Sequence, residues 1–201
     1  MTELRTDPIL IGLTGSAGSG KTTVADYLTI DHAFEHFAFA DVLKEMLEVL
    51  FNALGVDYAA LYEPQLKNQP IPALFGLTPR QLMQSLGDWG RSQHPELWVQ
   101  ALARSAGLHD LPNSTPVHDR IVVSDVRFEN EAAWLKSLQG ALVRVERDQA
   151  DTTQLPTGLR AHSSETSGPR LCVDAVISNT ALSKQSLHAR IDTYLQSNGV
   201  D

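Results

Sequence analysis

The sequence predicts an α/β fold, with a five-stranded, mainly parallel sheet that carries helices on both faces. Three observations lead to this prediction. Short apolar runs, typical of buried strands, alternate along the chain with longer segments of helical periodicity. A glycine-rich turn joins the first apolar run directly to a helix. The chain has 201 residues, which is enough for one domain with a lid-like insertion.

The chain begins with a strand that leads into a helix. Residues 9–14 form a short apolar run, and residues 22–28 begin a helix behind the glycine-rich turn. A second strand is expected over 37–40, and Asp41 can cap the helix that follows it. Prolines make the region 55–76 irregular.

Two helices occupy the middle of the chain. Thr78 is a capping residue, Pro79 fits the first helical turn and Gln81 stands three residues after the cap, so a helix starts here and runs to about residues 90–92. Pro95 opens the next helix, which ends near Gly107.

The second half alternates strands with helices again. A buried strand with a carboxylate at its C-terminal end is expected over 121–125, and a helix over 128–139 follows it. Strands are expected over 141–145 and 173–177, and a closing helix spans 183–195.

Parallel sheets of this kind bind ligands beyond the carboxyl ends of their strands. Four polar or glycine positions directly follow predicted strand ends, namely Gly15, Asp41, Asp125 and Arg147. We expect these four residues to converge on one rim of the sheet.

Residues 15–22, the phosphate loop, read G-S-A-G-S-G-K-T and match the pattern G-x-x-x-x-G-K-[ST] between a strand and a helix. Glycines let backbone N–H groups curl around a β-phosphate, and the helix N-terminus adds partial positive charge. Lys21 can bridge the β- and γ-phosphates, and the Thr22 hydroxyl can bind Mg²⁺. The alternative is a glycine-rich turn that binds nothing. The predicted ATP-binding residues of this segment are Gly15, Ser16, Ala17, Gly18, Ser19, Gly20, Lys21, Thr22 and Thr23.

The motif predicts the fold of the P-loop NTPases. Other patterns in the sequence indicate which class of P-loop protein this chain belongs to. The sequence contains neither the N-K-x-D segment nor the D-x-x-G switch of a GTPase. The chain is also short for a motor or a large ATPase. A small kinase that transfers the γ-phosphoryl group to a bound acceptor is the class that remains.

One helix carries a candidate acceptor surface. Arg80, Gln84, Asp88 and Arg91 fall on a single stripe of the helix that starts at Thr78. The opposite face carries Leu82, Met83, Leu86 and Trp89. A solvated face is the alternative, but the stripe lacks the lysine and glutamate that such faces favour. The stripe is therefore predicted to bind the acceptor.

A second polar cluster follows the strand over 121–125. Asp125 is placed to hold Mg²⁺ through water, with a helix cap as the alternative. Arg127 and Glu131 are four residues apart on the apolar side of the next helix, in the order that is poorer for a surface pair. We expect this pair to point into a cleft, where Arg127 binds the acceptor phosphate.

The segment 148–170 has few apolar residues and lies between two predicted strands, which is typical of a lid or a disordered segment. Arg147, Arg160 and Arg170 suit a lid that closes arginines on the triphosphate and excludes water. His162, Ser164 and Glu165 are either polar filler or a hinge. The predicted catalytic residues are Lys21, Asp125, Arg127 and Arg160.

Composition excludes several functions. The formal net charge of −8 argues against a polynucleotide-binding surface, yet 11 of the 16 basic residues are arginine, whose planar fork suits phosphate. No apolar stretch is long enough for a membrane helix, so a membrane partner is not expected. Cys172 is the single cysteine, which predicts a cytoplasmic protein.

Together these segments resemble the deoxynucleoside monophosphate kinases that tailed bacteriophages encode, within the P-loop nucleoside monophosphate kinase superfamily. The matching pieces are the phosphate loop, 39–44, 78–87, Trp98-Val99, Ser124-Asp125-x-Arg127 with Glu131, Arg147, and His162-x-Ser164-Glu165. The resemblance implies ATP-dependent phosphorylation of a deoxynucleoside monophosphate with Mg²⁺, in the host cytoplasm if the chain is phage-encoded.

The resemblance also implies roles for single residues. Arg80 and Arg127 would hold the acceptor phosphate, and Arg147 would belong to the ATP side. The nucleoside pocket would be lined by Lys44, Gly87, Asp88 and Trp98. The whole predicted substrate set is Asp41, Lys44, Arg80, Gln84, Gly87, Asp88, Arg91, Trp98, Arg127 and Glu131. A short proline-rich stretch replaces the family's long insertion before Arg80, so the preferred base stays open.

The predicted organisation is one kinase domain over 1–201, with an acceptor-binding helical part at about 41–107 and a lid at about 148–170. A P-loop kinase of another small acceptor, such as dephospho-coenzyme A or phosphomevalonate, is the alternative activity. A nucleotide-binding protein without turnover is the alternative from another class. The discrimination against ribose and the oligomeric state are left open, with a homodimer as one option.

Overall fold

We describe the fold from a computed structural model, for residues 8–111, 116–147, 170–180 and 183–200. Its strands are β1 (Ile9–Thr14), β2 (Glu35–Phe37), β3 (Arg120–Val123), β4 (Ala141–Glu146) and β5 (Ala175–Ser178). Its helices are α1 (Lys21–His32), α2 (Phe39–Ala53), α3 (Pro79–Gln93), α4 (Leu97–Ser105), α5 (Glu129–Ser137) and α7 (Lys184–Ser197). Two 3₁₀ turns, η1 (Tyr58–Leu61) and η2 (Pro72–Leu74), lie between α2 and α3.

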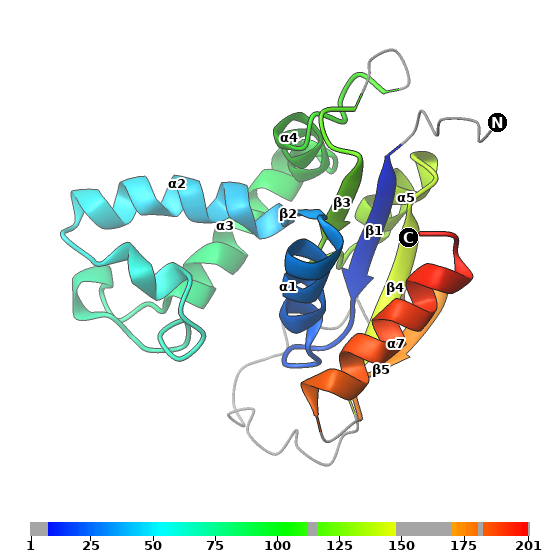
Figure 1. The fold of residues 1–201 in the computed structure, drawn as a ribbon. Coiled ribbons are helices and arrows are strands. Elements are labelled where there is room, and N and C mark those ends of the chain that lie inside the picture. Colours follow the sequence, from blue (N-terminus) through cyan, green and yellow to red (C-terminus); the bar gives the residue numbers. More distant parts are fainter. Residues whose placement is uncertain (1–7, 112–115, 148–169, 181–182, 201) are drawn as a thin grey trace. The chain divides into compact units, whose positions relative to one another are not determined.

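The strands form one sheet in the order β2-β3-β1-β4-β5, and each neighbouring pair is parallel (Figure 1). Helices α1 and α7 cover one face, where Leu28 and Ile191 join the buried cluster of the strands. Helix α5 covers the other face, and its Leu135 lies so close to Gly12 of β1 that a methyl group there would meet the leucine. The predicted parallel sheet with helices on both faces is confirmed.

Most predicted elements are present, but the second strand is displaced. The prediction placed it over 37–40, whereas β2 ends at Phe37 and Phe39 already begins α2. The reason is that the buried residues of α2, Phe39, Leu47 and Phe51, recur at multiples of four residues, so Phe39 belongs to a helical repeat. The prediction that Asp41 caps this helix was therefore wrong, because Asp41 lies within its first turn.

The start of α3 follows the prediction closely. The Thr78 hydroxyl accepts a hydrogen bond of 3.1 Å from the Gln81 N–H, and the Gln81 side chain accepts one of 2.9 Å from the Thr78 N–H. This reciprocal capping box satisfies two backbone donors that the helix itself leaves unpaired. Pro79 occupies the first turn, where its missing N–H costs nothing.

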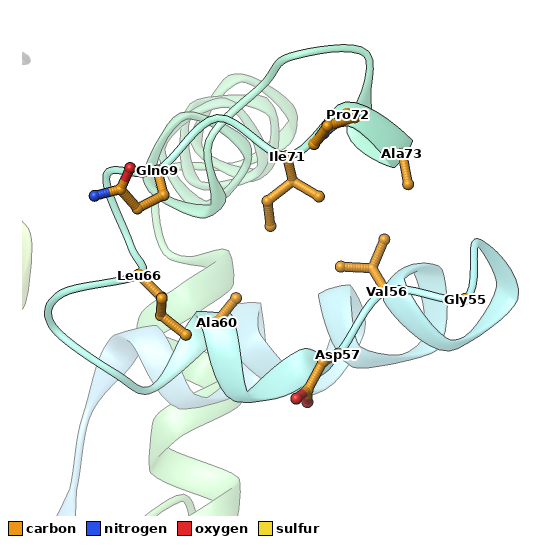
Figure 2. Close-up of a pocket in the computed structure, with 9 residues that line it drawn as sticks. All are labelled: Gly55, Val56, Asp57, Ala60, Leu66, Gln69, Ile71, Pro72 and Ala73. Atoms are coloured by element: carbon orange, nitrogen blue, oxygen red, sulfur yellow. The ribbon is translucent and has the colours of Figure 1, made fainter.

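The chain divides into two compact units, each described here by itself. The sheet unit contains Met1–Ala38 and Ala103–Asp201, and the helical unit contains Phe39–Leu102. The helical unit has its own buried cluster, formed by Leu47, Phe51, Val56, Ala60, Leu61 and Leu74. An open hollow of about 440 Å³ lies beside this cluster, and Val56 and Ile71 point into it (Figure 2). Its lining contains none of the predicted site residues.

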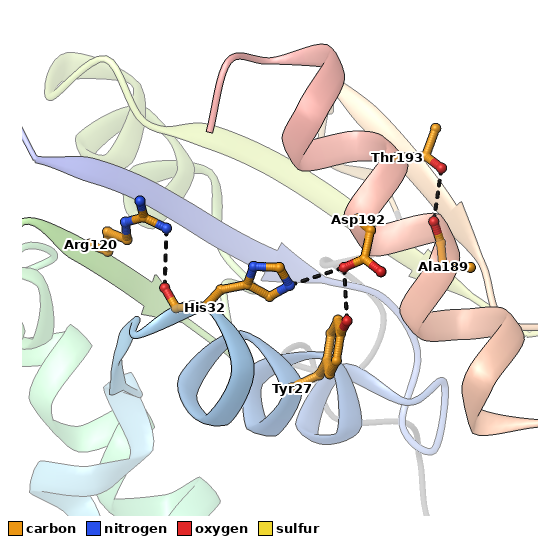
Figure 3. A network of polar contacts seen from close by, with 6 residues as sticks. All are labelled: Tyr27, His32, Arg120, Ala189, Asp192 and Thr193. Carbon is orange, nitrogen blue, oxygen red and sulfur yellow. Dashed lines mark hydrogen bonds and ion pairs between the residues drawn. The ribbon is translucent and has the colours of Figure 1, made fainter. Parts of the chain in front are cut away.

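A polar network joins α1 to α7 in the sheet unit (Figure 3). The Tyr27 hydroxyl donates a hydrogen bond of 2.8 Å to Asp192, and His32 Nε2 lies 3.0 Å from the same carboxylate oxygen. The network therefore fixes the C-terminal helix against the helix that follows the phosphate loop. No helix in the described ranges is long and apolar enough to cross a bilayer.

Candidate active site

The phosphate loop connects β1 to α1 at the carboxyl edge of the sheet. Gly15, Gly18 and Gly20 have φ values of 137°, 75° and 104°, in the region that favours glycine. A Cβ on Gly15 would overlap the Val145 carbonyl oxygen, so this turn also needs glycine for close contact with the end of β4. The geometry explains why the motif carries glycine at these positions.

Lys21 is the first residue of α1, and its side chain turns back over the loop. Its Nζ donates hydrogen bonds of 2.9 Å to the Gly15 carbonyl and 2.8 Å to the Ser16 carbonyl. Burial, followed by the positive charge of Arg127, lowers the pKa of Lys21 to about 8, while Asp125 acts in the opposite direction. The charges of Arg127 and Asp125 therefore both act on Lys21. Lys21 and Arg127 are partly buried cations, which fit a polyanionic ligand such as a triphosphate.

Asp125 lies in the turn directly after β3. The turn is fixed by the N–H of Ser124, which binds the Phe37 carbonyl, and by the N–H of Val126, which binds the Leu13 carbonyl. Asp125 is thus held between the ends of β2 and β1. Because the N-cap of α5 is Phe128, the alternative that Asp125 caps this helix is wrong. Its Mg²⁺ role stays a prediction.

Arg127 and Glu131 are arranged differently from the prediction, which placed both on one face of a helix. Helix α5 begins at Glu129, so Arg127 lies in the turn before it. The buried Glu131 carboxylate accepts hydrogen bonds of 2.7 Å from the Arg127 N–H and 3.0 Å from the Phe128 N–H. These bonds form because a helix start offers unpaired backbone donors to an acid in its first turn. Glu131 therefore fixes the backbone of Arg127.

The predicted lid is described only at its edges. Arg147 directly follows β4 and is exposed, and Arg170 directly precedes Leu171 and is also exposed. Arg160, His162, Ser164 and Glu165 lie outside the described residues, as does most of the segment 148–170.

In the helical unit, α3 carries the predicted acceptor stripe. Arg80, Gln84 and Arg91 are half-buried, and the Arg91 guanidinium donates to the Asp88 carboxylate at 2.7 Å. On the opposite face, Leu82, Met83 and Leu86 pack against the buried cluster of this unit, as expected. Trp89 differs, because half of its surface is exposed. The acceptor role of the stripe stays a prediction.

The remaining predicted pocket residues also lie in the helical unit. Lys44 forms an ion pair of 2.7 Å with Asp41, and its Nζ lies 5.2 Å from the centre of the Tyr62 ring. The Trp98 indole N–H donates a bond of 2.9 Å to the Gly87 carbonyl. These contacts orient the side chains of Lys44 and Trp98.

One residue of the site was not predicted. Asn179 follows β5 at the same edge of the sheet, and its side-chain amide donates a bond of 2.8 Å to the Ser19 carbonyl. The signal for it was available, because the rule used for Gly15, Asp41, Asp125 and Arg147 applies equally to a polar residue behind the last strand. The rule was wrong for Asp41, which lies within α2.

Comparison with known proteins gives one close relative in sequence. The chain is 36% identical over 146 residues to a protein of Acanthamoeba polyphaga mimivirus that bears the name "Putative deoxynucleotide monophosphate kinase". The match covers 69% of this chain and 74% of that protein. No model of a known protein family matches the sequence.

Comparison of structures concerns the fold. TT1252 from Thermus thermophilus is similar over 96% of this chain and 98% of its own, with a TM-score of 0.51 and 18% identity. Shikimate kinase from Aquifex aeolicus covers 95% of this chain and 98% of its own, with a TM-score of 0.48 and 14% identity. The parallel sheet, the strand–loop–helix motif and the similarity to TT1252 confirm the predicted α/β fold of the P-loop kinases.

Proposed function

Because this chain belongs to the deoxynucleotide monophosphate kinase family, we propose that it transfers the γ-phosphoryl group of ATP to a deoxynucleoside monophosphate and releases the diphosphate and ADP. The observation that carries the proposal is the phosphate loop over which Lys21 turns back, with Asp125 fixed in the turn between the ends of β2 and β1 and Arg127 two residues further along. It combines a cradle for a triphosphate, a second cation for another phosphate and a carboxylate for a metal ion.

The sheet unit supplies the ATP side of the proposed reaction. The backbone N–H groups of residues 15–20 and the Lys21 ammonium bind the β- and γ-phosphates. Thr22 and Asp125 fit Mg²⁺, because the ion prefers hard oxygen ligands and keeps water between itself and a carboxylate. When bound, the ion neutralises charge on the phosphate oxygens. Arg147 lies at the end of the neighbouring strand β4 and adds positive charge there.

For the acceptor, each unit offers candidate residues of its own: Arg127 in the sheet unit and the residues of α3 in the helical unit. Arg127 and Arg80 present planar guanidinium groups, which bind two phosphate oxygens at once. Gln84, Asp88 and Arg91 supply polar groups for the nucleoside. Two phosphates held in line need little else, because phosphoryl transfer depends on positioning and charge neutralisation more than on a general base.

A coupled assay of ADP release tests the proposal. The purified chain is given ATP, Mg²⁺ and one acceptor at a time, drawn from the four deoxynucleoside monophosphates, the four ribonucleoside monophosphates, dephospho-coenzyme A and phosphomevalonate. We expect stimulation by one or more deoxynucleoside monophosphates and a lower kcat/KM for the matching ribonucleotide. The panel also measures the base preference and the discrimination against ribose.

Two results would contradict the proposal. Stimulation by dephospho-coenzyme A or phosphomevalonate alone would make the chain a P-loop kinase of another small acceptor. Binding of ATP without stimulation by any acceptor would make it a nucleotide-binding protein without turnover. Lys21→Ala removes the ammonium group that is proposed to bind the triphosphate. This variant is the control that assigns any observed turnover to this site.

A further inference from the structure

We propose that Asn179 is a positioning residue of the phosphate loop. It directly follows β5, and its backbone N–H binds the Glu146 carbonyl at the end of β4. From this anchored position its side-chain Nδ2 donates a hydrogen bond of 2.8 Å to the carbonyl oxygen of Ser19. A carbonyl oxygen only accepts, so the group facing Ser19 is the amide NH₂. The two bonded residues are 160 positions apart in the sequence.

The bond acts on the peptide that joins Ser19 to Gly20. In a trans peptide the C=O and the N–H point in opposite directions. A carbonyl drawn toward Asn179 therefore turns the Gly20 N–H away from Asn179. In a phosphate loop the N–H groups at the helix N-terminus are the ligands of the phosphate oxygens. Asn179 thus sets the direction of one phosphate-binding donor without touching the nucleotide.

The packing around Gly20 supports this role. A Cβ built on Gly20 would overlap the Asn179 side-chain nitrogen, so the asparagine occupies the space that a glycine leaves open. Gly20 also has a φ of 104° and is the N-cap of α1. Its side-chain-free backbone cannot supply a cap of its own, and no side chain caps α1. The amide of Asn179 restrains this peptide instead.

The chemistry of the side chain matters as much as its place. A carboxamide is neutral, so it donates to the loop and adds no negative charge beside a triphosphate site. Asn179→Asp has nearly the same shape but presents a carboxylate to the Ser19 carbonyl, and its charge opposes the ligand. Asn179→Ala only removes the bond. The two variants therefore separate the loss of a donor from the addition of a charge.

The test measures ATP binding directly and rests on the proposed nucleotide site, although it needs no acceptor. The dissociation constant of a non-hydrolysable ATP analogue with Mg²⁺ is determined by calorimetry for the wild type, Asn179→Ala and Asn179→Asp. We expect an affinity about tenfold weaker for the alanine variant and about 100-fold weaker for the aspartate variant. The KM for the acceptor should change by less than about twofold, since Asn179 acts on the ATP side.

Asn198→Ala is the matched control, because the Asn198 amide donates a comparable bond of 2.7 Å to the Tyr194 carbonyl at the end of α7. We expect this variant to lose similar thermal stability and to bind the analogue like the wild type. If Asn179→Ala and Asn179→Asp bind the analogue as tightly as Asn198→Ala does, the inference is wrong. It is also wrong if both lower kcat and leave the dissociation constant unchanged.

The proposed function and this inference fail in different ways. A wild-type chain that binds the analogue but phosphorylates no deoxynucleoside monophosphate contradicts the function and leaves the comparison of the Asn179 variants valid. A wild-type chain that turns over with an acceptor, and whose Asn179 variants bind ATP normally, contradicts only the inference.

Discussion

The indole ring of Trp98 lies directly against the backbone of Gly90, so a Cβ at residue 90 would overlap the ring. The same ring donates from Nε1 to the Gly87 carbonyl at 2.9 Å, and only 4% of the residue is exposed. The Trp98 ring thus joins α4 to α3. The two helices can approach this closely only because residue 90 has no side chain.

Gly90→Ala should destabilise the helical unit. The added methyl forces the buried ring to move, and overpacking of this kind costs about 1–3 kcal/mol. Chemical denaturation followed by tryptophan fluorescence measures the loss. The matched control is Gly87→Ala, whose methyl would meet mainly the mobile end of Arg91. That variant should keep its stability or gain up to about 1 kcal/mol, because alanine favours the helix. Equal losses in both variants would contradict the packing argument.

Arg127→Ala should impair use of the acceptor far more than binding of ATP. We expect kcat/KM for the acceptor to fall about 100-fold, because a charge-assisted phosphate contact is removed. The dissociation constant of ATP should change by only a few fold. Arg104→Ala, at an exposed arginine near the end of α4, is the control. Equal loss of acceptor use and ATP affinity would show that Arg127 serves the other substrate.

Glu131 should act through Arg127 rather than by contact with the substrate. Glu131→Gln weakens the two bonds to the Arg127 and Phe128 N–H groups, and about 1–2 kcal/mol of stability should be lost. We expect kcat/KM for the acceptor to fall as well. The double variant with Arg127→Ala should be no slower than Arg127→Ala alone, since a lost arginine needs no positioning. Additive effects of the two substitutions would indicate direct contact of Glu131 with the substrate.

Asp174 should stabilise the fold only when it is ionised. Burial alone would raise the pKa of Asp174, but bonds from Lys136 and from the Leu142 N–H outweigh burial and lower that pKa below its ordinary value of 3.8. The folded protein therefore holds this proton less tightly than the unfolded chain. The stabilising contribution is complete above the unfolded pKa and is lost as the pH falls through the lower, folded pKa.

Unfolding in urea at two pH values checks this prediction. At about pH 7 Asp174→Asn should lower the free energy of unfolding by up to about 1 kcal/mol, the usual range for a partly exposed ion pair. At about pH 3 the difference from the wild type should shrink. A difference that is the same at both pH values would mean that charge is not its cause. Asp26→Asn, at an exposed aspartate of α1, is the control and should change little.

Sequence patterns were sufficient where one local rule determined the structure. The phosphate loop, the capping box at Thr78 and the parallel sheet follow from residue type and spacing alone. The rule failed at Phe39, because a short apolar run fits a strand and a helix start equally well until the buried repeat of α2 decides between them.

The candidate site, like the fold, was predictable from the sequence where a local pattern determined it. Lys21 follows from the phosphate-loop motif and Asp125 from its place at a strand end, whereas the effect of the Arg127 charge on Lys21 is evident only from the structure. The role of Glu131 was not predictable from charge spacing, which does not reveal the hydrogen bonds that its carboxylate accepts from two backbone N–H groups. The place of Asn179 behind the last strand was available from the sequence, but its bond to Ser19 depends on how distant strands meet, which no local pattern encodes.

The helical unit is one uninterrupted stretch of chain, Phe39–Leu102, with a buried cluster of its own. It leaves the sheet unit just after β2 and returns to it before β3, which are neighbouring strands of the sheet. In protein engineering, a donor segment can replace residues 39–102 without any change to the residues of the phosphate loop, provided that the join inside α4 continues this helix.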